Sequence, residues 1–327
     1  MKYSYIKLMI LVLNINSIVL SLSSNSIFYI WLSMEINLLS YISMFPKLTF
    51  TATNSMMNYF IPQALSSNIF LLSMIMNTYY KSSPITPLFI FFSLWIKLGF
   101  FPFHNWYFSI SNNMNWFMWF LLNTNQKIIP LWSLSLLLNI SPILLTFVFM
   151  NTLYSSLEIF NQSSIRWLIN SSSLNHMSWV VVSSPHSMNT WEIYMISYII
   201  LNLMLIKLIK NNNLSSISST INNKPLNTNI SILITMLNFM GLPPMMGFMP
   251  KMLTMISSKH IFINLSLLIS SLIHCYMYMT LSSQMLITKH IKTKMLTFNN
   301  NNTNSNINLS IISSLITMTM FPMWITN

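Results

Sequence analysis

The sequence predicts an all-α polytopic membrane protein with about 11 transmembrane helices, and three observations support this fold class. Of its 327 residues, 54% are hydrophobic and only 6% are charged, whereas soluble domains have about 25% charged residues. Apolar stretches long enough to span a bilayer alternate with polar clusters along the chain. Two of these stretches contain Gly-x-x-Pro, a pattern that interrupts a helix. We therefore exclude a soluble globular fold.

The apolar stretches number eleven when about 20 residues are required for each membrane crossing. They are 4–22, 26–45, 59–79, 84–103, 115–140, 141–160, 170–186, 190–210, 228–252, 261–288 and 305–325. The first has two lysines, Lys2 and Lys7, at its start, as in a signal peptide, but no small-residue cleavage site follows it, so we expect it to be retained. Because no segment could form a separate soluble domain, we expect residues 1–327 to form one transmembrane domain.

Several classes of function are excluded by residue types that are scarce. The three glycines are too far apart for a phosphate-binding loop, and one cysteine, Cys275, cannot form a disulfide or hold a cysteine-ligated metal or iron–sulfur cluster. His260 and His274 have a haem-like spacing, but no second helix offers a matching pair. The net charge of +12 is spread singly along the chain, so we expect no nucleic-acid partner.

The positions of the basic residues predict the orientation. With eleven spans, ten basic residues fall on the N-terminal face: Lys2, Lys7, Lys47, Arg166, Lys207, Lys210, Lys224, Lys289, Lys292 and Lys294. Only Lys81 and Lys259 fall on the opposite face. The abundance of Met and Asn and the scarcity of Ala and Arg are typical of an animal mitochondrial gene. The positive-inside rule then places the N-terminus on the matrix side of the mitochondrial inner membrane.

Lys127 is the first candidate functional residue, because it lies near the middle of the stretch 115–140. A lysine at the centre of a membrane helix costs about 2.5–3.5 kcal/mol, so such residues are usually functional. Asn123, Asn125 and Gln126 could hold water or relay hydrogen bonds beside it. The alternative is a structural lysine bonded to carbonyls near Pro130.

Glu35 is the second candidate, because it is the one acid placed in the middle of an apolar stretch; Glu158 and Glu192 fall near the ends of theirs. A carboxylate within the membrane needs a partner or exchanges protons. Lys97 is its most natural partner. The alternative is that Glu35 only forms a hydrogen bond to a neighbouring helix.

The two interrupted stretches are 96–102 and 240–244, and each has a lysine nearby, Lys97 in the first and Lys251 after the second. Inside a membrane a broken helix is tolerated where its backbone faces protein or a water-filled cavity, as in transporters built from repeats. A proline kink without function is the alternative for the breaks, and an interfacial anchor is the alternative for Lys251.

His176 is the last candidate, since it lies mid-span among Ser172, Ser173 and Asn175 and could relay protons. A hydrogen-bonded structural histidine is the alternative reading.

Five segments that contain these residues resemble, in order and over essentially the whole chain, the family of animal mitochondrial NADH-ubiquinone oxidoreductase chain 2. They are Trp31 to Leu39, Lys97 to Trp106, Gln126 to Pro130, Ser171 to Trp179 and Gly241 to Lys251. The resemblance implies an antiporter-like subunit of the proton-pumping arm of respiratory complex I, built from inverted repeats with broken helices. It predicts a first repeat over about 59–210, following or overlapping the Glu35 helix, and a partial second repeat over 211–327. The sequence departs from the commoner family pattern at Phe100 and Phe101.

The resemblance also implies roles for the candidate residues. Glu35 and Lys97 match the coupling ion pair of the family, Lys127 its central relay lysine, and Lys251 the ionisable residue of the second half-channel. His176 matches a histidine of the polar axis between them. A charge change at the Glu35–Lys97 pair would then favour proton transfer toward Lys127.

The expected cofactors and partners follow from the same resemblance. No cofactor is expected in this chain, and NADH, FMN, iron–sulfur clusters and ubiquinone are expected in partner subunits. The expected partners are other membrane-arm subunits and inner-membrane phospholipids, cardiolipin in particular. Two other functions stay open at this stage, a stand-alone cation/proton antiporter and a structural membrane scaffold.

Overall fold

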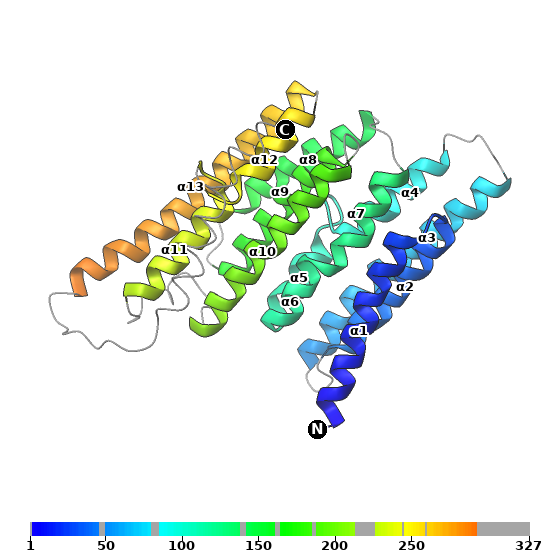
Figure 1. The fold of residues 1–327 in the computed structure, drawn as a ribbon, viewed down its shortest axis with the longest axis horizontal. Helices are drawn as coiled ribbons and strands as arrows, with labels where there is room; N and C mark the ends of the chain where they lie inside the picture. Colours follow the sequence, from blue (N-terminus) through cyan, green and yellow to red (C-terminus); the bar gives the residue numbers. More distant parts are fainter. Residues whose placement is uncertain are drawn as a thin grey trace. The chain divides into compact units, whose positions relative to one another are not determined.

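The computed structural model describes residues 2–45, 50–79, 85–137, 142–160, 164–184, 188–212, 226–243, 245–258 and 260–292. Within these ranges the chain is overwhelmingly α-helical, as the sequence predicts (Figure 1). The helices fall into two compact units, Met1–Phe147 and Val148–Asn327. We describe each unit by itself.

The first unit is built around α7. Its helices are α1 (Lys2–Ser23), α2 (Ile27–Ser43), α3 (Phe50–Tyr79), α4 (Ile85–Leu98), α5 (Asn105–Asn113), α6 (Trp116–Asn123) and α7 (Asn125–Leu137). α7 packs against α1, α2, α4 and α6, and α3 packs against α2, α4 and α5. Since α7 has neighbours on several sides, its polar first turn lies inside the unit.

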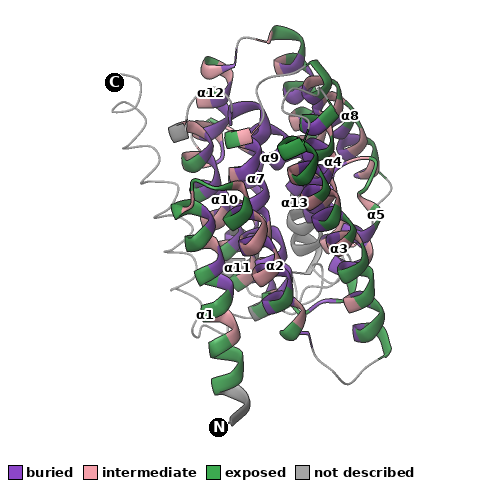
Figure 2. Cartoon of the chain, turned by 90° about the vertical axis from the view of Figure 1, so that its right-hand side faces the viewer, coloured by how far each residue is buried: buried purple, intermediate pink, exposed green. Residues whose placement is uncertain are grey.

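The second unit is built around α9. Its helices are α8 (Pro142–Glu158), which spans the boundary between the units, α9 (Ile165–Ser183), α10 (Met188–Asn212), α11 (Leu226–Met240), α12 (Phe248–Ser257) and α13 (Ile261–Lys292). α9 packs against α10, α12 and α13, and nearly all of its residues are buried (Figure 2). A helix this rich in Ser, Asn and His that is buried on every side needs polar partners inside the protein.

Outward-facing apolar side chains indicate the membrane environment. Four described helical segments are long and apolar enough to cross a bilayer: Tyr5–Ser23, Phe50–Tyr79, Thr190–Lys210 and Ile261–Thr280. On α1, Leu8, Met9 and Val19 are each more than half exposed, and exposed residues dominate this helix in Figure 2. In a bilayer these side chains contact lipid without cost.

The described helices agree with ten of the eleven predicted stretches, and 305–325 lies outside the described residues. Both predicted breaks are present, since α4 ends before Gly99 and α11 ends before Gly241. Two features were not predicted. The stretch 115–140 forms two helices, α6 and α7, and α5 forms in the gap between 103 and 115. The proposed repeat boundaries stay a prediction.

Five of the basic residues that predict the orientation lie outside the described ranges. They are Lys47, Lys81, Lys224, Lys259 and Lys294. The matrix-side N-terminus therefore stays a prediction as well.

Candidate functional site

Lys127 lies in the first turn of α7, directly after the break between α6 and α7. The break lies at Thr124, where φ is −115° and ψ is −76°, and the Thr124 hydroxyl donates to the Phe120 carbonyl at 2.7 Å, beside the last helical N–H bond of α6. The Lys127 side chain is only 3% exposed. Its Nζ lies 4.8 Å from the centre of the Tyr107 ring, where the face of the ring attracts a cation.

The two amides that precede Lys127 join it to three other helices. Gln126 donates from Nε2 to Asn37 Oδ1 on α2 at 2.9 Å, and its Oε1 accepts from the Tyr59 hydroxyl on α3 at 2.8 Å. Asn125 Nδ2 donates to Asn14 Oδ1 on α1 at 3.2 Å, and Asn14 in turn donates to Asn37 at 2.6 Å. The amides were candidates from the sequence, but Asn14 and Tyr59 were not. A continuous hydrogen-bonded network therefore surrounds the start of α7.

The break after α4 requires a glycine and is stabilised by hydrogen bonds from two indoles. Gly99 has φ +69°, and a Cβ there would lie 3.0 Å from side-chain atoms of Trp106 and Tyr107. Trp95 Nε1 donates to the Phe101 carbonyl at 2.7 Å. Trp106 Nε1 likewise donates to a carbonyl in the last turn of α4, at 3.2 Å. Neutral N–H groups thus donate to carbonyls at the end of the broken helix and just after it.

Lys97 stands in the last turn of α4 and is 6% exposed. Its own carbonyl accepts from Gln63 Nε2 on α3 at 3.2 Å. Glu35, which is partly buried on α2, interacts with the Lys97 ammonium through space. The structure therefore brings the predicted pair into electrostatic range of each other.

The break after α11 differs because a lysine takes part in it. Lys251, 8% exposed on α12, donates from Nζ to the Met240 carbonyl at 2.8 Å. Gly241 has φ +70°, and a Cβ on Gly247 would lie 2.2 Å from the Asn238 carbonyl. Only glycine allows this close approach. The cation therefore sits at the C-terminal end of α11, where the helix dipole favours positive charge.

His176 lies in the middle of the buried helix α9 and is 5% exposed. Its Nδ1 pairs with the Tyr194 hydroxyl on α10 at 2.9 Å. The imidazole also contacts the rings of Tyr198 and Phe239, with centroids 5.6 and 5.8 Å away. His176 therefore connects α10 with the last turn of α11.

A second buried histidine, His274 on α13, was tested from the sequence only as a haem ligand. Its Nδ1 lies 2.7 Å from the Ser270 carbonyl and 3.4 Å from Asn175 Nδ2. The Ser270 hydroxyl donates to Asn175 Oδ1 at 2.9 Å, and the Tyr278 hydroxyl donates to Ser172 at 2.7 Å. Residues 270, 274 and 278 recur every four positions, so helical periodicity could have revealed this polar face.

The remaining two acids lie near helix ends, as the sequence predicts. Glu158 is the last residue of α8 and accepts from the Tyr154 hydroxyl at 2.6 Å and from Trp167 Nε1 at 3.2 Å. Glu192 is exposed in the second turn of α10. The hydrogen bonds of Glu158 do not join it to the network at the start of α7 or to the polar residues around His176 and His274.

Each unit thus contains a buried network of amide, hydroxyl and nitrogen groups with lysines beside helix breaks. Comparison with known proteins identifies the family that has this arrangement. Residues 76–275, more than half of the chain, match the family described as NADH:quinone oxidoreductase/Mrp antiporter, TM. The chain belongs to this family.

Two relatives show how far the likeness within the NADH:quinone oxidoreductase/Mrp antiporter family extends. NADH-ubiquinone oxidoreductase chain 2 of Locusta migratoria is 32% identical, over 91% of this chain and 90% of the relative. The protein of the same name from Artemia franciscana is 31% identical, over 85% and 90% of the two chains. The resemblance predicted from five sequence segments is confirmed.

Solved structures confirm the antiporter-like fold of the family. A chain of respiratory complex I from Thermus thermophilus superposes with a TM-score of 0.80 at 14% identity, over 95% of this chain and 76% of that chain. A chain of the Mrp complex from Dietzia sp. superposes with a TM-score of 0.65 at 12% identity, over 95% and 59%. At these identities the likeness concerns the fold.

Proposed function

We propose that this chain is a proton-translocating membrane subunit of mitochondrial NADH:ubiquinone oxidoreductase, complex I. One observation supports the translocating role most directly: Lys127 is buried beside an aromatic ring, and the two residues before it form a hydrogen-bonded network that reaches α1, α2 and α3. The family and the named relatives support the assignment to complex I. A buried lysine of this kind is costly in a membrane unless it has a function.

In the first unit, we infer that Glu35, Lys97 and Lys127 form the relay. Glu35 holds the Lys97 ammonium by electrostatic attraction. When the carboxylate charge is neutralised or moves away, Lys97 loses part of the interaction that keeps it protonated, and transfer toward Lys127 becomes favourable. The Tyr107 ring and the amide network next to Lys127 then stabilise the arriving positive charge.

In the second unit, His176 and Lys251 serve as proton-handling residues. His176 accepts or donates through its pairing with the Tyr194 hydroxyl. Lys251 stays close to the Met240 carbonyl in its charged form, because the charge strengthens this hydrogen bond. Release of a proton weakens the bond and frees the lysine to change position.

Energy for transport comes from partner subunits in this proposal. Moving one charge against 100 mV costs about 2.3 kcal/mol, and we assign NADH, FMN, iron–sulfur clusters and ubiquinone to other subunits of the complex. The chain then acts as an enzyme only as a subunit of an H⁺-translocating NADH:ubiquinone reductase. Its N-terminus faces the matrix, and its exposed apolar helices contact other membrane-arm subunits and phospholipids, including cardiolipin.

Native separation of mildly solubilised mitochondria tests the assignment to complex I. The chain, detected by mass spectrometry, should migrate with the band that oxidises NADH. Migration alone, together with cation/proton exchange in vesicles without NADH, would instead establish the stand-alone antiporter.

A Lys127→Gln variant tests the translocating role. The assembled complex should keep NADH oxidation with an artificial electron acceptor, whereas ubiquinone-dependent proton translocation per complex should fall about tenfold or more. Lys210→Gln is the matched control, because Lys210 is an exposed lysine at the end of α10. Wild-type pumping in K127Q would make the chain a scaffold.

A further inference from the structure

His274 is a buried histidine whose tautomer the structure fixes. Its Nδ1 lies 2.7 Å from the Ser270 carbonyl oxygen, four residues earlier on α13. A carbonyl oxygen can only accept a hydrogen bond, so Nδ1 must bear the hydrogen. In the neutral ring, Nε2 is therefore the nitrogen with the free lone pair.

Nε2 of His274 is buried and makes no hydrogen bond of ordinary geometry among the described residues, although the Ser171 backbone on α9 also acts on the ring. The whole side chain is only 4% exposed. A buried acceptor without a partner costs free energy, and in folded proteins such groups usually bind an ordered water. Nε2 is thus ready to accept a proton or a water hydrogen in the interior of the second unit.

Two observations relate Lys251 on α12 to this part of α13. Cys275, the residue after His274, donates from Sγ to Met240 Sδ at 3.6 Å, and the Met240 carbonyl accepts from Lys251 Nζ at 2.8 Å. The Lys251 charge also acts on the His274 ring through space. Met240, at the end of α11, is therefore contacted both by Lys251 and by the residue next to His274.

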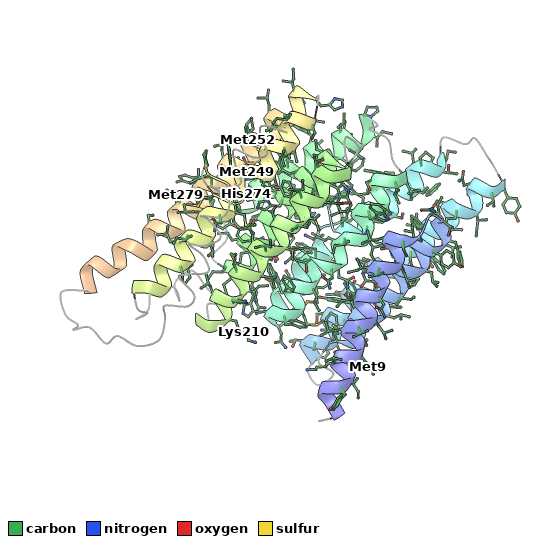
Figure 3. All side chains as sticks on the ribbon, viewed as in Figure 1. Met9, Lys210, Met249, Met252, His274 and Met279 are labelled. Atoms are coloured by element: carbon green, nitrogen blue, oxygen red, sulfur yellow. The ribbon has the colours of Figure 1, made fainter. Side chains whose placement is uncertain are left out.

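The other face of His274 is connected to α9. Asn175 Oδ1 accepts from the Ser270 hydroxyl at 2.9 Å, whereas Asn175 Nδ2, 3.4 Å from Nδ1, forms no hydrogen bond to it in this tautomer because both atoms bear hydrogens. One turn further along α13, Tyr278 donates to Ser172 at 2.7 Å. Asn175 is next to His176 in the chain, so the polar face of α13 reaches the helix that holds the predicted relay histidine. Figure 3 labels His274 on α13.

A further orphaned polar group lies on α11, in the turn before the break. Both amide atoms of the Asn238 side chain are buried without partners, and the residue is fully buried. Asn238 belongs to the same turn as Met240, the carbonyl partner of Lys251. Two unpartnered polar groups on helices that pack against each other indicate buried water at the end of α11.

We propose that His274 is a further proton-transfer residue of the second unit, which exchanges a proton with Lys251 through a buried water at the end of α11. In this step an N–H bond of the ammonium breaks, the water relays the proton, and a new N–H bond forms at Nε2. The products are a neutral lysine and an imidazolium whose two N–H groups face Ser270 and the water. This inference rests on the proposed translocating function.

Two conservative substitutions test the proposal. His274→Asn keeps a donor in the region of Nδ1, and His274→Gln keeps an amide of similar reach, but neither side chain can take up a proton. We expect both variants to assemble and to lower proton translocation per assembled complex about tenfold or more. His260→Gln, at the beginning of α13, is the matched control and should pump normally.

Chemical rescue separates proton transfer from packing. In His274→Ala vesicles, added imidazole should restore part of the pumping, whereas pyrrole, which has the same ring size but no basic lone pair, should not. Equal effects of both additives would overturn the proposal, as would wild-type pumping in H274N and H274Q. Reduced assembly with unchanged pumping per complex would show that His274 only packs.

An experimental map of the wild-type complex at a resolution that shows water gives a test that needs no variant. Water should lie within hydrogen-bond reach of His274 Nε2, on the side of Lys251. A dry Nε2 packed against hydrocarbon would overturn the proposal. If K127Q pumps normally, the proposed function itself fails; if K127Q is impaired and H274Q is not, only the role of His274 fails.

Discussion

The two helix breaks have similar backbone geometry, but different chemical groups donate hydrogen bonds to the carbonyls at each break. Both have a glycine with nearly the same dihedral angle, φ +69° at Gly99 and φ +70° at Gly241. At the break after α4, backbone carbonyls accept from neutral groups, the indoles of Trp95 and Trp106 among them. After α11, the Met240 carbonyl accepts from a lysine ammonium.

In the first unit, the bonds that the indoles donate at the break do not involve the nearby lysine. In the second unit, the lysine itself donates to a carbonyl of the break. Lys97 can gain or lose a proton without any change in the bonds that the indoles donate. Lys251 contributes a charge-assisted bond to the break itself, and such a bond is roughly twice as strong as a neutral one. Deprotonation of Lys251 therefore loosens the end of α11, whereas deprotonation of Lys97 leaves the end of α4 intact.

Alanine at the three glycines should give the largest effects and should rank the breaks. A Cβ at Gly247 would lie 2.2 Å from a backbone oxygen, and one at Gly241 would lie 2.8 Å from a backbone oxygen. At Gly99 the nearest atoms, at 3.0 Å, belong to side chains. The left-handed conformation adds about 1–2 kcal/mol at Gly99 and Gly241. We expect the amount of assembled complex to fall most for G247A, then G241A, then G99A.

Native gels of the three variants measure this order directly. Ala64→Gly, within α3, is a control for a small change elsewhere in the chain. A greater loss of assembly for G99A than for G247A would contradict the account of the second break.

Methionine at the two lysines should give intermediate effects of different kinds. Both substitutions remove a buried ammonium, and both therefore relieve the free-energy cost of burying that charge. Lys251→Met also leaves the Met240 carbonyl without its donor, which costs about 1–3 kcal/mol. We expect K251M to lower both assembly and pumping, whereas K97M should assemble normally and pump poorly. The measurements are the amount of native complex and the proton translocation per complex.

The smallest effect is expected for Trp95→Phe, which removes one neutral donor from the first break. The ring contacts with Phe91 and Phe100 at 4.9 and 4.5 Å would be largely kept. The loss of the bond to Phe101 should cost about 1 kcal/mol. Thermal dissociation of the complex should therefore begin a few degrees lower for W95F, with pumping per complex unchanged. If W95F destabilised the complex more than K251M does, the two breaks would not be stabilised as described.

Local sequence patterns were sufficient to predict both Gly-x-x-Pro breaks, because glycine and proline act on the backbone of their own residues. They missed the break at Thr124, where the backbone leaves helical geometry with φ −115° and ψ −76° although neither glycine nor proline is adjacent. Pro62 and Pro130, in contrast, lie inside continuous helices. Proline therefore marks a break only where a residue such as glycine accompanies it.

The candidate site was predicted in part for a similar reason. Lys127, Lys251 and His176 stand out because an ionisable residue is unusual in an apolar stretch, and all three are buried. Their partners are less visible in one sequence. Asn14 and Asn125 are 111 positions apart, and no local pattern indicates which of the many asparagines will meet. The roles of Glu35, Lys97, Lys127, His176 and Lys251 in proton transfer stay predictions.

The Asn14 bonds also determine how α1 is rotated about its own axis. Leu8 and Val19 are exposed, while Asn14 is completely buried. Because lipid is as apolar as leucine, the apolar side chains of α1 distinguish poorly between one rotation and another. A buried asparagine does distinguish them, as it does when it sets the register of a coiled coil. Asn14, together with the equally buried Ser17 and Ser21, thus specifies which face of the first helix meets the protein and which meets the bilayer.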